Sequence, residues 1–317
     1  MKKYVILALF ALISADTIYA QTTVNKSFSG VKHIRINTAA GDCDIKKGTG
    51  ANVDVELKYS YDASSYSPRF DQSGDRLTIG ETRTGKDYHG GANWTITVPD
   101  GVEIDFSTGS GNLAINGLTI NIDARTGSGD IQIADVKGEV DANTGSGNID
   151  VNEFVGNAKL NTGSGTADIS EAEGKLDLNC GSGNIKLSQC KAYFKINTGS
   201  GNINADKITL TDYGRFNTGS GRARVTLAET PKFDLSLNSG SGDAELDFNG
   251  NEIVGVIVMK ASKNHGHITA PFEFDSTKEE SYGNGDDNVT IVKTAKKGNG
   301  TNRIEVSTGS GDAVLRK

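Results

Sequence analysis

Residues that could hold a metal ion follow a repeated Gly-Ser-Gly phrase. A calcium site on such turns needs carboxylates at matching places on consecutive turns, because a hard divalent ion prefers several oxygen ligands. Isolated aspartates between neutral residues and one arginine do not form that set, so we expect no calcium site. Along the array, the residue after each phrase is Asn112, Asp130, Asn148, Thr166, Asn184, Asn202, Arg222 and Asp243.

The four histidines offer a second possible metal site. They are His33, His89, His265 and His267, and the last two form a His-Gly-His pair within reach of one ion. A bound metal ion needs further protein ligands, and no convincing third ligand stands near the pair. We interpret the pair as part of a solvated loop, and we expect no metal ligands and no cofactor.

Catalysis would require other groupings of side chains. A polysaccharide-cleaving enzyme built on a β-helix needs clustered carboxylates with a base on one outer face. Here the outward positions carry scattered aspartates and lysines without a convincing pair, and the many serines occupy turns. We therefore predict no catalytic residues, and the chain is not expected to be an enzyme.

The three cysteines are expected to be structural. Cys43 and Cys190 fall at inward positions of the repeat, and Cys180 replaces the threonine before one Gly-Ser-Gly. Cys180 and Cys190 would lie near opposite ends of one flattened turn, beyond the about 4.4–6.8 Å Cα separation that a disulfide requires. We expect free, buried thiols that pack like small apolar residues.

The element that positions all these residues is an 18-residue repeat. Its first five intervals are each 18 residues long, followed by intervals of 20 and 21. Constant spacing of this length indicates a solenoid. The first glycines of the phrase are Gly109, Gly127, Gly145, Gly163, Gly181, Gly199, Gly219, Gly240 and Gly309.

Each repeat predicts one rung of an all-β, parallel, right-handed β-solenoid with two short strands. Between Gly147 and Gly165, apolar and polar residues alternate, Phe154 and Gly156 mark a corner, and a second alternation follows. The glycines suit turns that need a positive φ or a close backbone approach. Stacked rungs bury continuous apolar columns that no single rung could close.

Four inward columns are expected. The first two lie on the first strand of each rung, the third at the corner and the fourth on the second strand. They read Leu113, Ile131, Ile149, Ala167, Ile185 and Ile203; Ile115, Ile133, Val151, Ile169, Leu187 and Ala205; Leu118, Val136, Phe154, Ala172, Cys190 and Ile208; and Ala124, Ala142, Leu160, Leu178, Ile196 and Phe216.

An asparagine column precedes the threonine of the phrase. Two interpretations are open: amide hydrogen bonds along the stack, as in cross-β ladders, or a simple preference for asparagine entering a turn. The column reads Arg125, Asn143, Asn161, Asn179, Asn197, Asn217 and Asn238.

Domain organisation follows from the positions at which the 18-residue repeat is interrupted. Residues 1–20 have a basic start, an apolar stretch and Ala20 at a cleavage position, which is typical of a signal peptide. Residues 21–317 are expected to form one solenoid domain. It has an irregular capping region at 21–106, regular rungs at 107–250, and C-terminal rungs at 251–317 with a protruding loop near 262–302.

Composition and charge exclude some partners. The chain carries a formal charge of −7, which becomes −8 without residues 1–20. No basic face is evident, so a nucleic-acid partner and an anionic membrane surface are disfavoured. No later segment is apolar enough for membrane insertion.

The segment from Trp94 to Gly101, followed by Ser107 to Asn112 and its repeats, resembles a bacterial adhesin-like family of unknown function related to the head-GIN-domain proteins. The resemblance covers essentially the whole chain after residue 20. It implies an extracytoplasmic parallel β-solenoid and brings no catalytic residues.

A non-catalytic, exported structural or binding protein is the leading functional prediction. Its partner would be a protein or glycan at the cell envelope, and its location periplasmic, secreted or cell-surface. A periplasmic envelope scaffold or stress-related accessory protein is the alternative, and a polysaccharide-active β-helix enzyme is the weakest one. Few aromatic residues, only 7% of the chain, argue against a glycan partner, since glycan sites commonly use aromatic faces.

Overall fold

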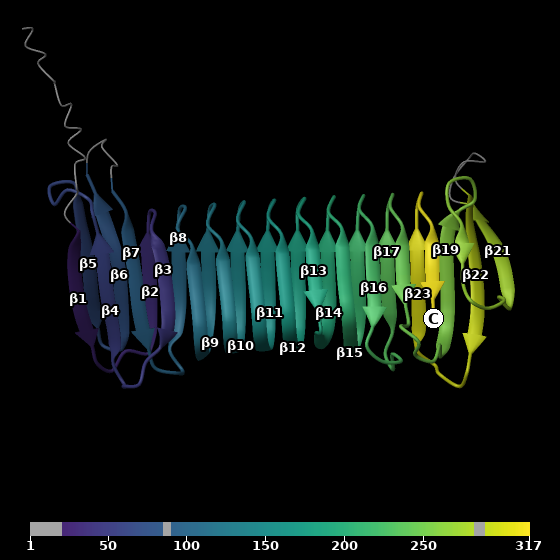
Figure 1. Cartoon of the computed structure of the whole chain (residues 1–317), viewed down its shortest axis with the longest axis horizontal. Helices are drawn as coiled ribbons and strands as arrows, with labels where there is room; N and C mark the ends of the chain where they lie inside the picture. Colours follow the sequence, from purple (N-terminus) through teal and green to yellow (C-terminus); the bar gives the residue numbers. More distant parts are fainter. Residues whose placement is uncertain (1–20, 85–89, 282–288) are drawn as a thin grey trace, which may run out of the picture.

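The computed structural model describes residues 21–84, 90–281 and 289–317. In these residues every regular element is a β-strand, and the strands stack side by side into one long, flat body (Figure 1). The all-β solenoid expected from the repeat is thereby confirmed. The predicted signal peptide, residues 1–20, and His89 lie outside the described residues.

The central rungs stack in parallel, in register with the sequence repeat. Ile149 pairs with Ile131 on one side and Ala167 on the other, each 18 residues away. The strands are β8 (Glu103–Thr108), β9 (Leu113–Thr126), β10 (Ile131–Thr144), β11 (Ile149–Thr162), β12 (Ala167–Cys180), β13 (Ile185–Ser188), β14 (Lys191–Thr198), β15 (Ile203–Thr218), β16 (Ala223–Leu227), β17 (Leu235–Ser239) and β18 (Ala244–Asp247).

Each rung bends at a corner that divides it into two halves. Glu153 takes a φ of 54° in β11, and Gly156 follows with a φ of 143°. Pairing with the neighbouring rungs skips only Glu153 and resumes at Phe154, so most central rungs form one bent strand where two short ones were expected. We call the surface of the first halves, such as residues 149–152, the first face, and that of the second halves, such as 157–162, the second face.

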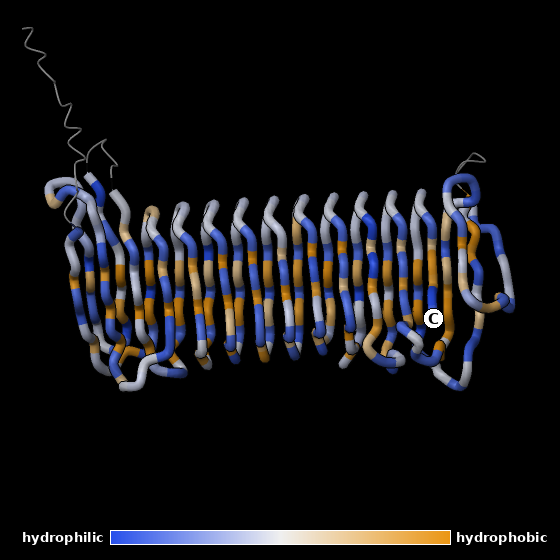
Figure 2. Tube along the Cα trace, in the orientation of Figure 1, coloured by the Kyte–Doolittle hydropathy of each residue, from blue (hydrophilic) through white to orange (hydrophobic). Residues whose placement is uncertain are grey.

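The four predicted inward columns all lie in the core. Leu160 is 1% exposed, whereas its neighbour Lys159 is exposed. Apolar positions recur at the same height from rung to rung (Figure 2). A continuous apolar column therefore runs along the stack, as a solenoid requires.

The N-terminal end departs from the parallel pattern. Strand β4 pairs antiparallel with both β1 and β7, and β5 with β6. Within this irregular capping region, β5 and β6 form an antiparallel hairpin that lies between β4 and β7 in the sequence. The strands are β1 (Thr22–Phe28), β2 (His33–Thr38), β3 (Asp42–Lys47), β4 (Val53–Tyr59), β5 (Tyr66–Ser73), β6 (Arg76–Arg83) and β7 (Ala92–Val98).

The C-terminal end corrects the predicted loop at 262–302. Strand β22 pairs antiparallel with β19 and β21, and its Val292 and Ala295 are buried. The glycine, asparagine and lysine content of this region obscured that short alternation. Strands β23 and β24 insert beside β17 and β18, so the chain ends within the stack. The strands are β19 (Gly255–Ser262), β20 (Ile268–Thr269), β21 (Ser276–Ser281), β22 (Val289–Lys297), β23 (Arg303–Thr308) and β24 (Ala313–Arg316).

The edge strands at the two ends are poorly suited to pair with a strand of another molecule. On β1 the exposed Lys26 stands between half-buried Val24 and Phe28, and β5 contains Pro68. At the other end β20 has two residues and β21 is highly charged. Charged side chains, proline and short strands at a sheet edge all discourage edge-to-edge pairing.

Candidate functional site

A hydrogen-bonded asparagine ladder crosses the second face. Asn161 Nδ2 donates to Asn143 Oδ1 at 2.8 Å, and each later member donates in the same direction to the rung before it. Ser307 Oγ donates to Asn238 Oδ1 at the C-terminal end of the ladder. The ladder interpretation of this column is therefore confirmed.

The threonine before each Gly-Ser-Gly also joins neighbouring rungs. Thr162 Oγ1 donates to the carbonyl of Gly147 at 2.8 Å and accepts the Gly165 N–H at 3.0 Å. Most other rungs repeat this arrangement with threonine or serine. Cys180, at the same position, has no hydroxyl to complete it.

We expect Cys180→Thr to stabilise the fold. The new hydroxyl would reach the Gly165 carbonyl and the Gly183 N–H as its neighbours do, which contributes about 1 kcal/mol. Thermal melts should show a Tm higher by roughly 2 °C. Cys180→Val has the same shape as threonine without the oxygen, and an equal gain from it would contradict the hydrogen-bonding explanation.

The column after the glycines has a structural role that the sequence analysis missed. Asp130 Oδ1 accepts the backbone N–H of Asn148 in the next rung at 2.7 Å, and Asn112 Oδ1 accepts that of Asp130 at 2.9 Å. The side-chain oxygen, and not a negative charge, is what this position requires. The alternation of asparagine with aspartate was the signal that could have indicated it.

Calcium and chelators are expected to leave the Tm nearly unchanged. The carboxylate oxygens of Asp130 and Asp243 already accept backbone N–H groups, at 2.7 and 3.0 Å. Specific binding at a hundredfold excess over the dissociation constant would stabilise the folded state by about 2.7 kcal/mol. A saturable Tm increase at micromolar calcium would show that the column does bind the ion.

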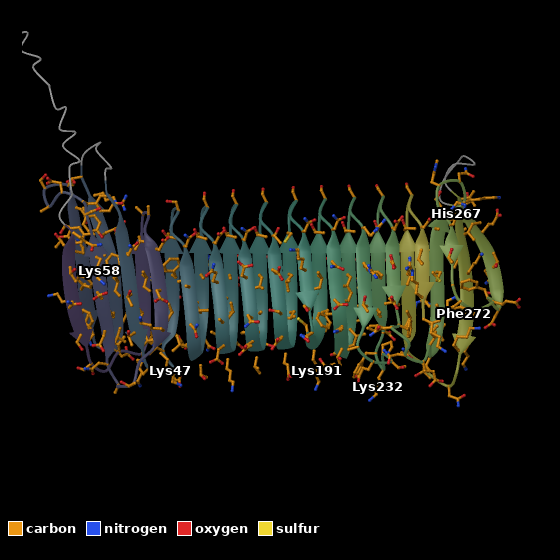
Figure 3. The ribbon with its side chains drawn as sticks, viewed as in Figure 1. Lys47, Lys58, Lys191, Lys232, His267 and Phe272 are labelled. Carbon is orange, nitrogen blue, oxygen red and sulfur yellow. The ribbon has the colours of Figure 1, made fainter. Side chains whose placement is uncertain are left out.

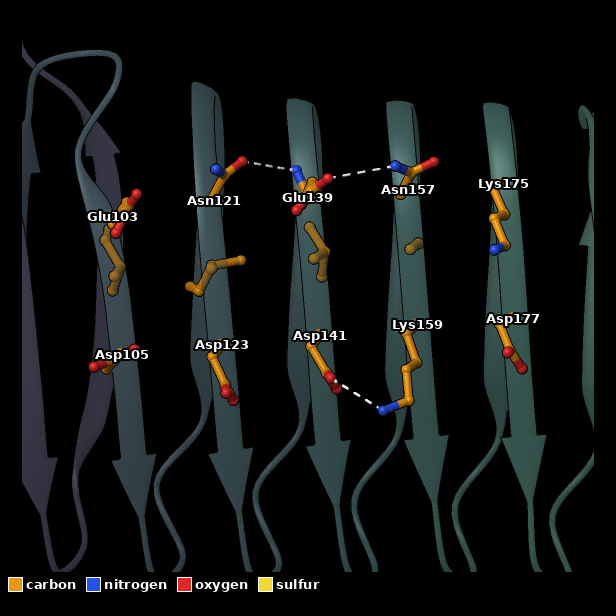
Figure 4. A pocket seen from close by; sticks show the side chains of 14 residues that line it. Glu103, Asp105, Asn121, Asp123, Glu139, Asp141, Asn157, Lys159, Lys175 and Asp177 are labelled. Carbon is orange, nitrogen blue, oxygen red and sulfur yellow. Dashed lines mark hydrogen bonds and ion pairs between the residues drawn. The ribbon is translucent and has the colours of Figure 1, made fainter.

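An open groove on the second face is the candidate functional site. Its volume is about 450 Å³, and it spans five neighbouring rungs (Figure 4). Two rows of outward side chains line it, with buried Ile104, Ile122, Val140 and Ala158 between them. The rows are Glu103, Asn121, Glu139, Asn157 and Lys175, and Asp105, Asp123, Asp141, Lys159 and Asp177.

Ion pairs between rungs hold the charged side chains of the second face in place. Lys159 Nζ lies 3.2 Å from Asp141 Oδ2, and Lys195 Nζ lies 2.8 Å from Asp177 Oδ2. The hydrogen bond to Asp177 raises the pKa of the Lys195 ammonium. The aspartates and lysines expected to be scattered are thus ordered partners along the stack.

The groove has an acidic end and a basic end. Strands β8 to β10 contribute five carboxylates to its two rows: Glu103, Asp105, Asp123, Glu139 and Asp141. Strands β11 and β12 contribute Lys159, Lys175 and the carboxylate of Asp177. Beyond the groove the same rows continue on β14 and β15 with Tyr193, Lys195 and Arg215, and β15 bulges opposite Tyr193 at residues 211–213, which include Asp212. Reading these two positions at an 18-residue period would have revealed this polarity from the sequence.

The predicted histidine and cysteine positions fall outside the groove. His33 pairs with Glu103 at 2.9 Å near its acidic end, and exposed His267 faces Asp312 at the C-terminal end (Figure 3). All three cysteines are free and buried, and burial raises the pKa of the Cys180 thiol to about 11. Among the described residues, no three histidine, cysteine or acidic side chains are grouped as a metal site.

The family described as Toastrack DUF4097 matches residues 31–257. Curated proteins gave no significant match. Within residues 21–84, 90–281 and 289–317, no helix could cross a membrane.

Several solved structures are similar to this chain at low identity. A "putative adhesin" from Parabacteroides distasonis ATCC 8503 is 14% identical, covering 94% of this chain and 97% of that one with a TM-score of 0.42. A "putative lipid binding protein" from the same organism is 13% identical, with coverage of 94% and 96% and a TM-score of 0.41. A "putative adhesin" from Parabacteroides merdae ATCC 43184 has 13% identity, the same coverage and a TM-score of 0.40.

Proposed function

The chain belongs to the Toastrack DUF4097 family, and from this premise we propose that it is a non-catalytic structural and binding protein that acts outside the cytoplasm. The groove of the second face carries the proposal, because it is open, shallow and lined by charges of both signs, of which Lys159 and Asp141 are paired with each other. Such a surface suits an extended partner held by many weak contacts. A catalytic pocket, in contrast, normally encloses its substrate.

The partner we propose is a protein or glycan of the cell envelope. Export is supported by residues 1–20, whose basic start, apolar stretch and Ala20 are typical of a cleaved signal peptide. The asparagine ladder and the threonine contacts make the face rigid, so little conformational freedom would be lost when a partner binds. This rigidity favours recognition by a preformed surface.

Binding of purified residues 21–317 to isolated envelopes tests the proposal. Glu139→Ala combined with Lys175→Ala changes the groove without altering the net charge, and should weaken binding about tenfold. The matched control is Asp168→Ala with Lys186→Ala, a charge pair 3.6 Å apart on the first face. Equal binding by wild type and both variants would overturn the proposal, and so would release of sugar fragments from the envelope.

A further inference from the structure

The charge pattern of the second face is complementary to itself when reversed. Its acidic rungs and its basic rungs lie side by side in one plane, so a second copy turned end for end would place each half over its opposite. We propose that two copies of this chain pair through their second faces, about a two-fold axis that runs parallel to the strands between β11 and β12. This inference rests on the proposed role of the second face as a binding surface.

The row that contains Lys159 fits this axis. A rotation about it places β11 over β12 of the partner copy, β10 over β14, and β9 over β15. A rotation about an axis parallel to the strands does not change a residue's position along the strand direction. Each row of one copy therefore faces the same row of the second copy. Three pairs of opposite charge result: Lys159 with Asp177, Asp141 with Lys195, and Asp123 with Arg215.

The two flanking rows are compatible with the same axis. In the row of Glu139, that carboxylate meets the Tyr193 hydroxyl of the second copy, and Asn157 meets Lys175. In the ladder row, Asn161 meets Asn179, Asn143 meets Asn197, and Arg125 meets Asn217. Shifting the axis by half a rung, onto β11, would place Lys159 against itself, so the charges favour one register.

The size of the shared surface predicts a weak dimer. Six strands at about 4.8 Å spacing and about 20 Å of strand length give roughly 600 Å² from each copy. The total of roughly 1,200 Å² lies at the lower end of specific interfaces. Association should therefore depend on concentration and weaken as salt screens the charges. An envelope partner and a second copy would compete for the groove.

Charge exchange in purified protein tests the dimer. Sedimentation analysis at low salt should show a monomer-dimer equilibrium, with about tenfold weaker association for Asp141→Lys or Lys195→Asp alone. The double variant should regain association, because the exchanged charges meet again across the axis. Within one copy its new ammonium at position 141 lies beside Lys159, and its new carboxylate at position 195 lies beside Asp177. Both are contacts between like charges and are unfavourable, so a recovery of dimer association cannot come from contacts inside one chain.

The control is Lys186→Asp on the first face, which also removes a lysine paired with an aspartate of the preceding rung. It should associate like wild type. A protein that stays monomeric at low salt, a double variant that does not recover, or an equal loss in the control would each overturn the dimer. Because this measurement contains no envelope material, its failure would leave the envelope-binding proposal to be judged by its own experiment.

Discussion

Gly165→Ala is expected to destabilise the protein by more than about 3 kcal/mol, beyond the usual range for overpacking. A Cβ at this position would lie 1.9 Å from the carbonyl oxygen of Gly147 in the preceding rung. The oxygen belongs to the backbone, and the Cβ is attached directly to the backbone of its own rung. Neither atom can rotate away, so the clash is relieved only if the two rungs separate. The same contact recurs along the stack, which explains the second glycine of the phrase by close approach and not by a positive φ.

Ser164→Ala is the matched control for this prediction. Ser164 lies one residue before Gly165 at the exposed tip of the turn, so its change should alter stability by about 0.5 kcal/mol or less. Urea unfolding of both variants gives the comparison. If Gly165→Ala unfolded at the same urea concentration as Ser164→Ala, the rungs could not be packed as closely as described.

Leu160→Asp should be the most damaging change in the core. Leu160 is 1% exposed and lies between Ala142 and Leu178 in adjacent rungs. Replacing it removes apolar contacts and buries a carboxylate without a partner, which costs at least about 4 kcal/mol. Since rungs interact mainly with their neighbours, the loss should begin as local fraying around β11. Hydrogen exchange would detect this fraying.

Lys159→Gln is the appropriate surface comparison. Lys159→Asp would not serve as a neutral surface change, because Lys159 is paired with Asp141 and an aspartate there would face two others in its row. Glutamine removes the ion pair without adding repulsion, at a cost of about 0.5 kcal/mol. Equal protease sensitivity of Leu160→Asp and Lys159→Gln would mean that the inward and outward positions are shifted by one residue.

The central rungs could be predicted from the sequence because the parallel stack preserves its period. Each 18-residue step brings residues of the same kind into contact, as Ile131 does with Ile149. The inward columns are therefore visible as repeated apolar positions. The asparagine ladder was foreseen as one of two possibilities, since a column of one residue type does not specify where its amides point.

The two ends and the groove could not be predicted to the same extent. The β5–β6 hairpin pairs antiparallel, as β22 does with its neighbours, so the 18-residue repeat gives no register for them. The polarity of the groove is a property of several rungs together. The roles of Asp141 and Lys159, for example, become apparent only from the ion pair between them, which joins residues 18 positions apart.

Fractionation of the native host, combined with the intact mass of the protein, tests most directly whether it acts outside the cytoplasm. We predict that it is found in the periplasm, at the cell surface or in the medium, with a mass that corresponds to a chain starting near Gln21. A cytoplasmic protein that retains Met1 would contradict this account.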